Sequence, residues 1–495
     1  MPSMLLAALL VSLATAPDAD LAPLEPTPAS GETPEAPAPA SEPAPVATPA
    51  PAPAPEPEGP APVPVVTATP APAKPHGHAY ESPPAVGKTD ATILNAKHGE
   101  ESDVAQSRYK IGKGYTLSSK DGRFSLQVRG RIQFRYDLEH YNTTGAAAKD
   151  TVQSLQLRRM RLMLQGAVFS PYVKYHLQFG FSPRDMQNDL PNEPGSIRRN
   201  PLRDARIELD RLRDFTVWVG QFKAPFSRER MLSSANMNLV DRSTVNAEFN
   251  LDRDLGVQVM SKDLGGLGGR LAYYAGVFMG EGRNSFDLTD SGMLYVGRFE
   301  VNPFGKFEDY SQGDLARSAK PGLSIGGAYA YQDRAHAARG NVGDYPIDRG
   351  TTNFHHVNAD IMFKWRGLSF QTAFHFRKGF NRKTGGAVDE TGTPIPTVAA
   401  RQGLGWFAQT GYVVPKIPLE VVGRYSLIRN NYGKTLSSLP DTDEAGGGLN
   451  WYFVGHDLKL QLDYFRLWDQ TMGTTNAERA RNGTDRIRLQ VQVYF

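Results

Sequence analysis

Basic side chains at alternating positions are the residues of this sequence most suited to a chemical role. Arg129, Arg131 and Arg135 alternate with apolar residues or glycine, and Arg159 and Arg161 repeat the spacing further along the chain. Alternate residues of a β-strand project from the same face. The planar guanidinium group pairs with two oxygens at once, so a row of arginines on one face suits the binding of oxyanions.

The elements that must position these arginines are predicted by the same alternation. Apolar residues or glycine occupy the even positions from Phe124 to Leu138, and polar or charged residues occupy the odd ones. The final residues repeat this pattern and end on Phe495, which is typical of outer-membrane proteins. Similar segments are predicted at about 155–169, 172–182, 202–210, 215–223, 253–261, 269–279, 293–303, 322–333, 353–366, 367–379, 402–414, 417–429, 442–453 and 457–469.

These segments add up to sixteen strands, an even number, as a closed antiparallel bacterial barrel requires. Very short connections such as Ser170-Pro171 and Pro415-Lys416 alternate with long ones, which is the pattern of periplasmic turns and external loops. The long 304–321 connection breaks this alternation. The five tryptophans lie near strand ends and are predicted to form aromatic girdles at the two membrane interfaces. We therefore predict an all-β, sixteen-stranded antiparallel transmembrane β-barrel.

The first part of the chain has a different composition. Residues 1–16 contain an apolar run followed by Ala14-Thr15-Ala16, and they are interpreted as a secretory signal peptide. Residues 17–78 are rich in Pro and Ala and are predicted to be a disordered linker. Residues 79–120 are polar and aperiodic, and no structure is assigned to them. The barrel is assigned to residues 121–495.

Charge is unevenly distributed along the chain. Residues 1–110 hold 13 acidic and 5 basic residues, which leaves 39 acidic and 50 basic residues for the remainder. This excess of positive charge on the barrel favours anionic partners. The chain contains no cysteine, so thiol and disulfide chemistry are excluded. Its mean hydropathy is −0.43, which is compatible with a barrel because only alternate strand residues face lipid.

Several motifs resemble the phosphate-selective porin O and P family in order and spacing. They are Leu157-Arg158-Arg159-Met160-Arg161, the run from Val219 to Phe226, Asp241-Arg242-Ser243, the run from Arg253 to Gln258, and the run from Tyr274 to Phe278. The resemblance covers about residues 115–495. It implies a sixteen-stranded, trimeric barrel with an arginine-rich anion pathway, and an external loop, here about 224–252, that folds inward to narrow the pore.

Nine basic residues are the candidates for lining the pore and binding anions. Strand alternation and the resemblance together nominate Arg129, Arg131, Arg135, Arg158, Arg159, Arg161, Lys223, Arg298 and Arg377. Arg158, Arg159 and Lys223 match basic positions of the family near its constriction. Arg158 conflicts with regular alternation, so either a bulge intervenes in its strand or only Arg159 and Arg161 face the interior. Among residues of pore-facing parity, basic ones outnumber acidic ones about three to one.

These features predict an outer-membrane porin for passive diffusion of small anions, with phosphate as the preferred substrate. The alternatives are a general or differently selective porin, or an outer-membrane enzyme or adhesin on the same barrel. No motif for a nucleophile, a phosphate-binding glycine loop or a metal site is present, so no catalytic residue, metal or cofactor is predicted. The expected partners are small anions, outer-membrane lipid and two further copies of the chain, with no nucleic acid.

Overall fold

The computed structural model describes residues 106–110, 112–142, 151–186, 200–285 and 292–495. The predicted signal peptide and linker lie outside the described residues. Eighteen strands are present in the described part: β1 Gln106–Lys110, β2 Gly114–Ser118, β3 Ser125–Tyr141, β4 Thr151–Val168, β5 Ser170–Gly180, β6 Leu202–Leu209, β7 Thr216–Lys223, β8 Arg253–Ser261, β9 Leu271–Phe278, β10 Leu294–Val301, β11 Gly322–Ala335, β12 Thr351–Trp365, β13 Leu368–Lys383, β14 Gly403–Val413, β15 Leu419–Arg429, β16 Thr442–Val454, β17 Leu458–Asp469 and β18 Thr484–Tyr494.

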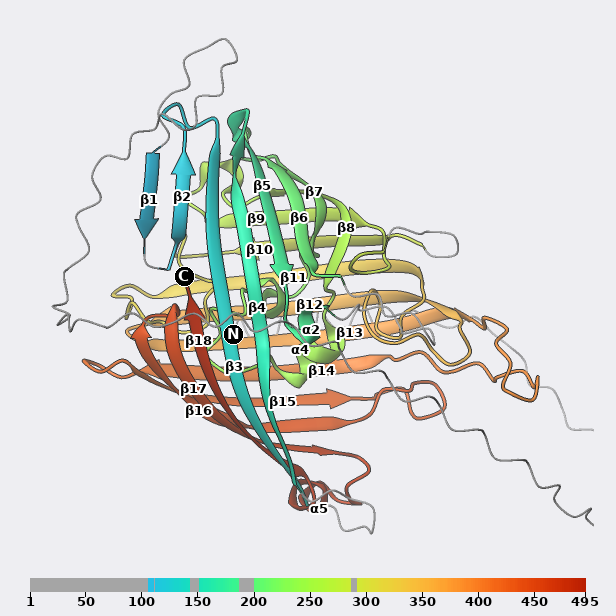
Figure 1. The fold of residues 1–495 in the computed structure, drawn as a ribbon. Helices are drawn as coiled ribbons and strands as arrows, with labels where there is room; N and C mark the ends of the chain where they lie inside the picture. Colours follow the sequence, from blue (N-terminus) through green and yellow to red (C-terminus); the bar gives the residue numbers. More distant parts are fainter. Residues whose placement is uncertain (1–105, 111, 143–150, 187–199, 286–291) are drawn as a thin grey trace, which may run out of the picture. The chain divides into compact units, whose positions relative to one another are not determined.

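Strands β3 to β18 form a closed antiparallel barrel (Figure 1). Each strand pairs with the next along the chain, and β18 closes the barrel by pairing with β3 from Thr484 opposite Tyr141 to Tyr494 opposite Arg131. Closure leaves no row of unpaired backbone groups facing lipid, which is why a sheet can cross a membrane only as a barrel. The predicted sixteen-stranded barrel is confirmed, and each predicted strand corresponds to one observed strand.

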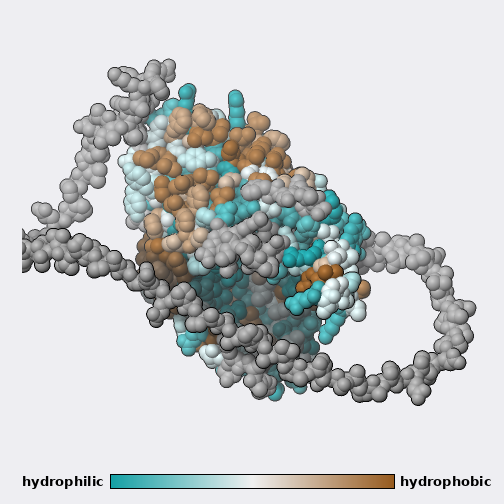
Figure 2. Space-filling model, turned by 45° about the vertical axis from the view of Figure 1, so that its right-hand side comes forward, coloured by the Kyte–Doolittle hydropathy of each residue, from teal (hydrophilic) through white to brown (hydrophobic). Residues whose placement is uncertain are grey.

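The two faces of each strand differ in the way that the alternation predicts. On β3, Gln133 and Arg135 are buried, and so is Arg131. Phe134, which lies between Gln133 and Arg135, is instead half exposed on the outside of the barrel. On β18, Leu489 and Val491 are exposed, and the intervening Gln490 is buried. In Figure 2, hydrophobic side chains gather toward the left and top of the face shown. The barrel therefore presents an apolar outer wall to lipid and a polar, charged interior.

The two ends of the barrel differ in the length of their connections. At the short-turn end, β4 and β5 are joined at Phe169, and β12 and β13 at Arg366-Gly367. Both Phe169 and Arg366 adopt positive φ, at 62° and 50°, which reverses the chain within one or two residues. The long-loop end carries the connection 224–252 and the short helices α2 (Pro183–Met186) and α5 (Asn476–Arg481). Among the described residues, no helix is both long and apolar enough to cross a membrane.

A hairpin of β1 and β2 lies beside β3, close to the C-terminus (Figure 1). β2 pairs with the start of β3, from Ser118 opposite Ser125 to Tyr115 opposite Val128. β18 reaches only as far as Arg131 on the same edge of β3, so the hairpin continues this edge where the last strand ends. The sequence left the segment 79–120 unassigned, and the structure places β1 and β2 within it. Its strands are short, and the pairing of β2 with β3 is not visible in a local pattern.

The tryptophans only partly follow the predicted girdles. Trp365, Trp406 and Trp451 are exposed on the outer wall. Trp218 instead faces the interior, where the guanidinium carbon of Arg206 lies 4.0 Å from its ring centre. Trp468 is buried because α5 covers it, and its indole nitrogen donates a hydrogen bond to Asn476. The girdle assignment was therefore wrong for these two residues.

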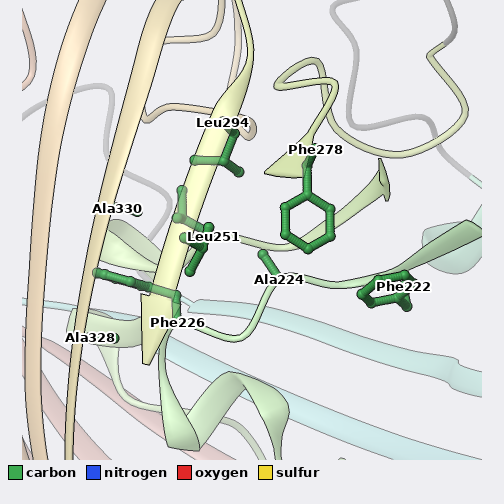
Figure 3. Close-up of a cluster of buried hydrophobic side chains, with 9 residues drawn as sticks. Phe222, Ala224, Phe226, Leu251, Phe278, Leu294, Ala328 and Ala330 are labelled. Atoms are coloured by element: carbon green, nitrogen blue, oxygen red, sulfur yellow. The ribbon is translucent and has the colours of Figure 1, made fainter. Parts of the chain in front are cut away.

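The connection 224–252 lies inside the barrel and contains the helices α3 (Arg228–Met231) and α4 (Thr244–Phe249). Its two ends pack against the walls of β9, β10 and β11, through Phe226 and Leu251 among others (Figure 3). Its middle packs on the opposite wall, where Leu239 contacts Val422 and Phe465. We call this segment the inner loop. It fills the interior beside β10 to β17 and leaves space along β3 to β8.

An ion-pair network ties the start of the inner loop to the barrel. Arg228 donates to Asp360 of β12 at 2.7 Å, to Ser324 of β11 at 2.7 Å and to Asp309 at 2.6 Å. Arg298 of β10 donates to the other carboxylate oxygen of Asp360, also at 2.7 Å. Asp309 belongs to the long connection 302–321 at the short-turn end. The connection 302–321 therefore contacts the inner loop from the short-turn end of the barrel. This contact accounts for a long connection at an end where the other turns are short.

Candidate functional site

Two cavities occupy the space that the inner loop leaves open. The outer cavity, toward the long-loop end, has a volume of about 670 Å³. The inner cavity, toward the short-turn end, has a volume of about 590 Å³. The outer cavity is lined by 13 Lys or Arg and 6 Asp or Glu residues, and the inner one by 8 and 3. Both cavities thus carry an excess of positive charge, which raises the local concentration of anions.

Four residues line both cavities: Arg161 of β4, Lys223 of β7, Ser234 of the inner loop and Arg253 of β8. They therefore mark the boundary where one cavity meets the other, and we call them the constriction. Lys223 and Arg253 lie directly opposite each other in the β7–β8 pair. An anion that passes between the cavities meets three cationic side chains and a hydroxyl at this point.

The constriction cations differ in how far their charge is neutralised. Arg161 makes a bidentate pair with Asp185 at 2.7 and 2.8 Å, and Arg253 makes another with Asp204 at 2.9 and 3.1 Å. Lys223 instead donates to the backbone carbonyls of Met231 and Leu232, at 3.2 and 3.1 Å. Within the described part of the chain, Lys223 forms no ion pair with a carboxylate. Among the three cations of the constriction, Lys223 is therefore the one whose partners are carbonyl oxygens rather than a carboxylate.

Above the constriction, several arginines converge on one carboxylate of the inner loop. Asp241 accepts hydrogen bonds from Arg135 at 2.6 Å, Arg158 at 3.1 Å and Arg159 at 3.3 Å, and Arg488 of β18 lies 3.9 Å away. Burial alone would raise the pKa of Asp241, but the charges of Arg158, Arg135 and Arg159 outweigh burial and hold this pKa well below its usual value. The carboxylate is therefore ionised across the physiological pH range. All five side chains line the outer cavity.

Arg158 reaches this cluster through a β-bulge. Gln133 of β3 lies opposite Arg159, and Phe134 lies opposite Leu157, so Arg158 is the extra residue of β4. A bulge places two consecutive side chains on one face of the strand. Arg158 and Arg159 are accordingly both buried in the interior, and Leu155 is exposed outside. Of the two alternatives that the sequence left open for Arg158, the bulge is the one observed.

The inner cavity carries two further predicted residues, Arg129 and Arg131. Arg131 donates to the hydroxyl of Ser234 at 3.1 Å, and Arg129 donates to the carbonyl of Gly112 at 2.9 Å. Both guanidinium groups lie over the ring of Tyr494, at 4.4 Å for Arg129 and 5.9 Å for Arg131. Neutral partners hold both groups in position without cancelling their charge. The β1–β2 hairpin therefore contributes to the site by supplying the Gly112 carbonyl.

Arg298 and Arg377 lie elsewhere. Neither is among the residues that line the two cavities. Arg298 pairs with Glu300 and Asp360, and Arg377 pairs with Glu248 of the inner loop. Both side chains are fully buried in these pairs. Their geometry is that of braces between the inner loop and the wall, and it offers no surface to a passing anion.

Asp241, Arg242 and Arg253 are among the residues of the site that sequence reasoning missed. Arg242 lines the outer cavity and donates to the carbonyls of Glu229 and Leu232, at 2.7 and 2.8 Å. Asp241 and Arg242 lie in a loop, where strand alternation gives no signal, and Arg253 opens a strand. All three belong to motifs that carry the family resemblance, and this signal could have identified them. No group of three or more His, Asp or Glu residues in the described ranges is arranged to hold a metal ion.

Comparisons with known proteins agree with the sequence motifs. The model of the family described as phosphate-selective porin O and P matches residues 126–312, which run from β3 to the turn after β10. A search of curated proteins found no significant match. Solved structures of similar fold include the anion-selective porin from Comamonas acidovorans, at 12% identity and a TM-score of 0.46, covering 75% of this chain and 99% of that one.

Two other similar structures are the outer-membrane channel DcaP of Acinetobacter baumannii and OmpF of Salmonella typhi. The first has 12% identity and a TM-score of 0.44, and covers 76% of this chain and 99% of the other. The second has 13% identity and a TM-score of 0.47, and covers 79% and 100%. Over residues 126–312 the chain is thus similar to the phosphate-selective porin O and P family, and its closed sixteen-stranded antiparallel barrel is an architecture of bacterial outer-membrane proteins.

Proposed function

We propose that this porin conducts small anions in preference to cations, and that phosphate is its preferred substrate. The observation that carries the proposal is the constriction, where Lys223 is held by carbonyl oxygens rather than by a carboxylate. A cation at the boundary between two basic cavities lowers the energy of an anion there and raises that of a cation. The alternative is a general porin, in which the constriction exerts no strong charge preference.

The preference for phosphate is supported by the arginine geometry. Phosphate carries more charge than chloride and offers several oxygen acceptors, so it gains more from converging guanidinium and ammonium groups. A binding advantage of about 1.4 kcal/mol corresponds to tenfold in affinity. An anion that is held in this way blocks the passage of chloride while it is bound. The trimer that the family resemblance implies stays a prediction, and light scattering of the purified protein would test it.

The experiment is a planar-bilayer measurement on the purified full chain. In a gradient of dilute KCl, the reversal potential should favour chloride, and millimolar phosphate should then reduce the chloride current in a saturable manner. The Lys223→Met variant should require a higher phosphate concentration for half-block. Arg486→Met is the matched control, because Arg486 also lines the outer cavity but is paired with Glu139 at 2.6 Å, away from the constriction.

The outcomes separate the two parts of the proposal. A reversal potential that favours potassium would contradict the anion preference. A chloride current that phosphate leaves unchanged would contradict the phosphate preference while leaving the anion channel intact. Equal effects of the two variants on half-block would show that the constriction has no special role and that overall charge alone governs binding.

A further inference from the structure

Asp241 is the internal anion of an arginine cluster that we define as Arg135, Arg158, Arg159 and Arg488. The cluster is assembled from three strands, β3, β4 and β18, and Asp241 comes from the inner loop. One carboxylate oxygen accepts from Arg158 and Arg159, and the other accepts from Arg135 and Arg158. A single carboxylate therefore occupies the place where the guanidinium groups converge, which is the place that suits an oxyanion.

The members of the cluster depend on Asp241 to different degrees. Arg488 has a second carboxylate in Asp463, and Arg135 has one in Asp137 at 2.9 Å. Among the described residues, Arg158 and Arg159 have no carboxylate partner other than Asp241. Four guanidinium groups thus face three carboxylates. An anion from solution that took the place of Asp241 would find the same donors already positioned.

The backbone around Asp241 is held while its side chain borders open space. The Val240 amide donates to Asp463 at 3.0 Å, and the Asp241 carbonyl accepts from Arg424 at 3.0 Å. The side chain retains 22% exposure and lines the outer cavity. Its carboxylate can therefore leave the guanidinium groups by side-chain rotation, with no movement of the inner loop.

We propose that Asp241 is a tethered competitor that sets how strongly the arginine cluster binds oxyanions. This inference rests on the proposed function, because it assumes that oxyanions pass through the outer cavity. Conduction requires a site that attracts the ion and then releases it. A carboxylate tethered beside the cluster is at high effective concentration, so it lowers the apparent affinity for phosphate and speeds phosphate release. The residue thereby limits trapping at the entrance to the constriction.

The test is the concentration of inorganic phosphate that half-blocks the chloride current of the full chain in planar bilayers. Asp241→Asn removes the competing charge with almost no change of volume. The phosphate concentration that gives half-block should then fall at least about tenfold, which corresponds to about 1.4 kcal/mol of binding free energy. Glu139→Gln is the matched control. It removes the same charge from the same cavity, but its partner is Arg486 rather than the cluster, so the shift should stay below about twofold.

Each outcome bears on the inference. Equal shifts in the two variants would attribute the effect to net charge and would overturn it, as would an unchanged half-block in Asp241→Asn. A wild-type channel that phosphate does not block would instead contradict the proposed function itself. Should Asp241→Asn yield no heat-modifiable barrel, Asp241→Glu keeps the charge but moves the carboxylate by one methylene. The phosphate concentration that gives half-block should then still fall relative to wild type, and an unchanged concentration overturns the inference.

Discussion

The Nζ of Lys223 and the Nη2 of Arg242 donate to the same oxygen, the carbonyl of Leu232, at 3.1 and 2.8 Å. One backbone carbonyl of the inner loop therefore holds two cations, one from β7 and one from the loop itself. The two positive charges repel each other, so this arrangement is favoured only if backbone dipoles or a bound anion offset the repulsion. The shared carbonyl thus places Lys223 of the constriction beside Arg242 of the outer cavity.

The first prediction concerns the charge of Lys223. Lys223→Gln should shift the reversal potential of the channel toward zero in dilute KCl, because the least compensated charge at the constriction is lost. The difference in reversal potential between variant and wild type should shrink in ~1 M KCl. The Debye length is ~8 Å at 0.15 M salt and shorter at ~1 M, so the charge of Lys223 is then screened more strongly. Lys262→Gln, at the exposed rim of the inner cavity, is the control and should change the potential less. A larger effect of the control would contradict the role of Lys223.

The second prediction concerns the anchor of the inner loop. Arg228→Met leaves Asp309 without its 2.6 Å partner, and loss of one member of a buried ion pair costs about 3–5 kcal/mol. Asp360 retains Arg298, so the barrel wall should still assemble. We expect a heat-modifiable barrel with a higher single-channel conductance and more frequent conductance fluctuations. Arg213→Met, which breaks an exposed pair with Asp214 at a short turn, should leave both unchanged.

The third prediction concerns the bulge in β4. Deleting Arg158 removes the extra residue and restores regular alternation, so Leu157 stays outside and Arg159 stays inside. The barrel should therefore assemble, with weaker block by phosphate because one arginine of the cluster is lost. Deleting Leu162, in a regular stretch of the same strand, should prevent assembly because it turns the following side chains to the wrong face. Heat-modifiability on a gel distinguishes the two, and equal assembly of both deletions would contradict the bulge.

The fourth prediction concerns the start of the chain. Deletion of residues 17–105 should leave assembly and conductance unchanged, since this segment is Pro-rich or polar and precedes β1. Deletion of 17–118 also removes the β1–β2 hairpin, which pairs with β3 and supplies the carbonyls that hold Arg129 and Gln127. It should lower the temperature at which the barrel band shifts on a gel. Identical behaviour of the two deletions would show that the hairpin is dispensable.

The barrel could be predicted from sequence because its cause is local. The period-two alternation seen from Phe124 to Leu138 places apolar side chains on one face and polar ones on the other. Lipid outside and water inside then decide which face is which. The same alternation predicts the interior side for Arg129, Arg131, Arg135, Arg159 and Arg161, and all five line one of the two cavities. Longer or irregular features, such as the bulge at Arg158, depend on pairing with a neighbouring strand.

Only the tertiary structure decided which interior cations remain accessible to an anion. The partner of Arg158 is 83 residues away at Asp241, and the partners of Arg228 and Arg377 are 132 and 129 residues away. The inner loop brings these charges together, and no local pattern in the sequence encodes its path. Arg298 and Arg377 therefore lie in closed pairs, whereas Lys223 lies at the constriction. The alternation of residues determined the wall, and contacts between distant segments determined where positive charge faces the open space.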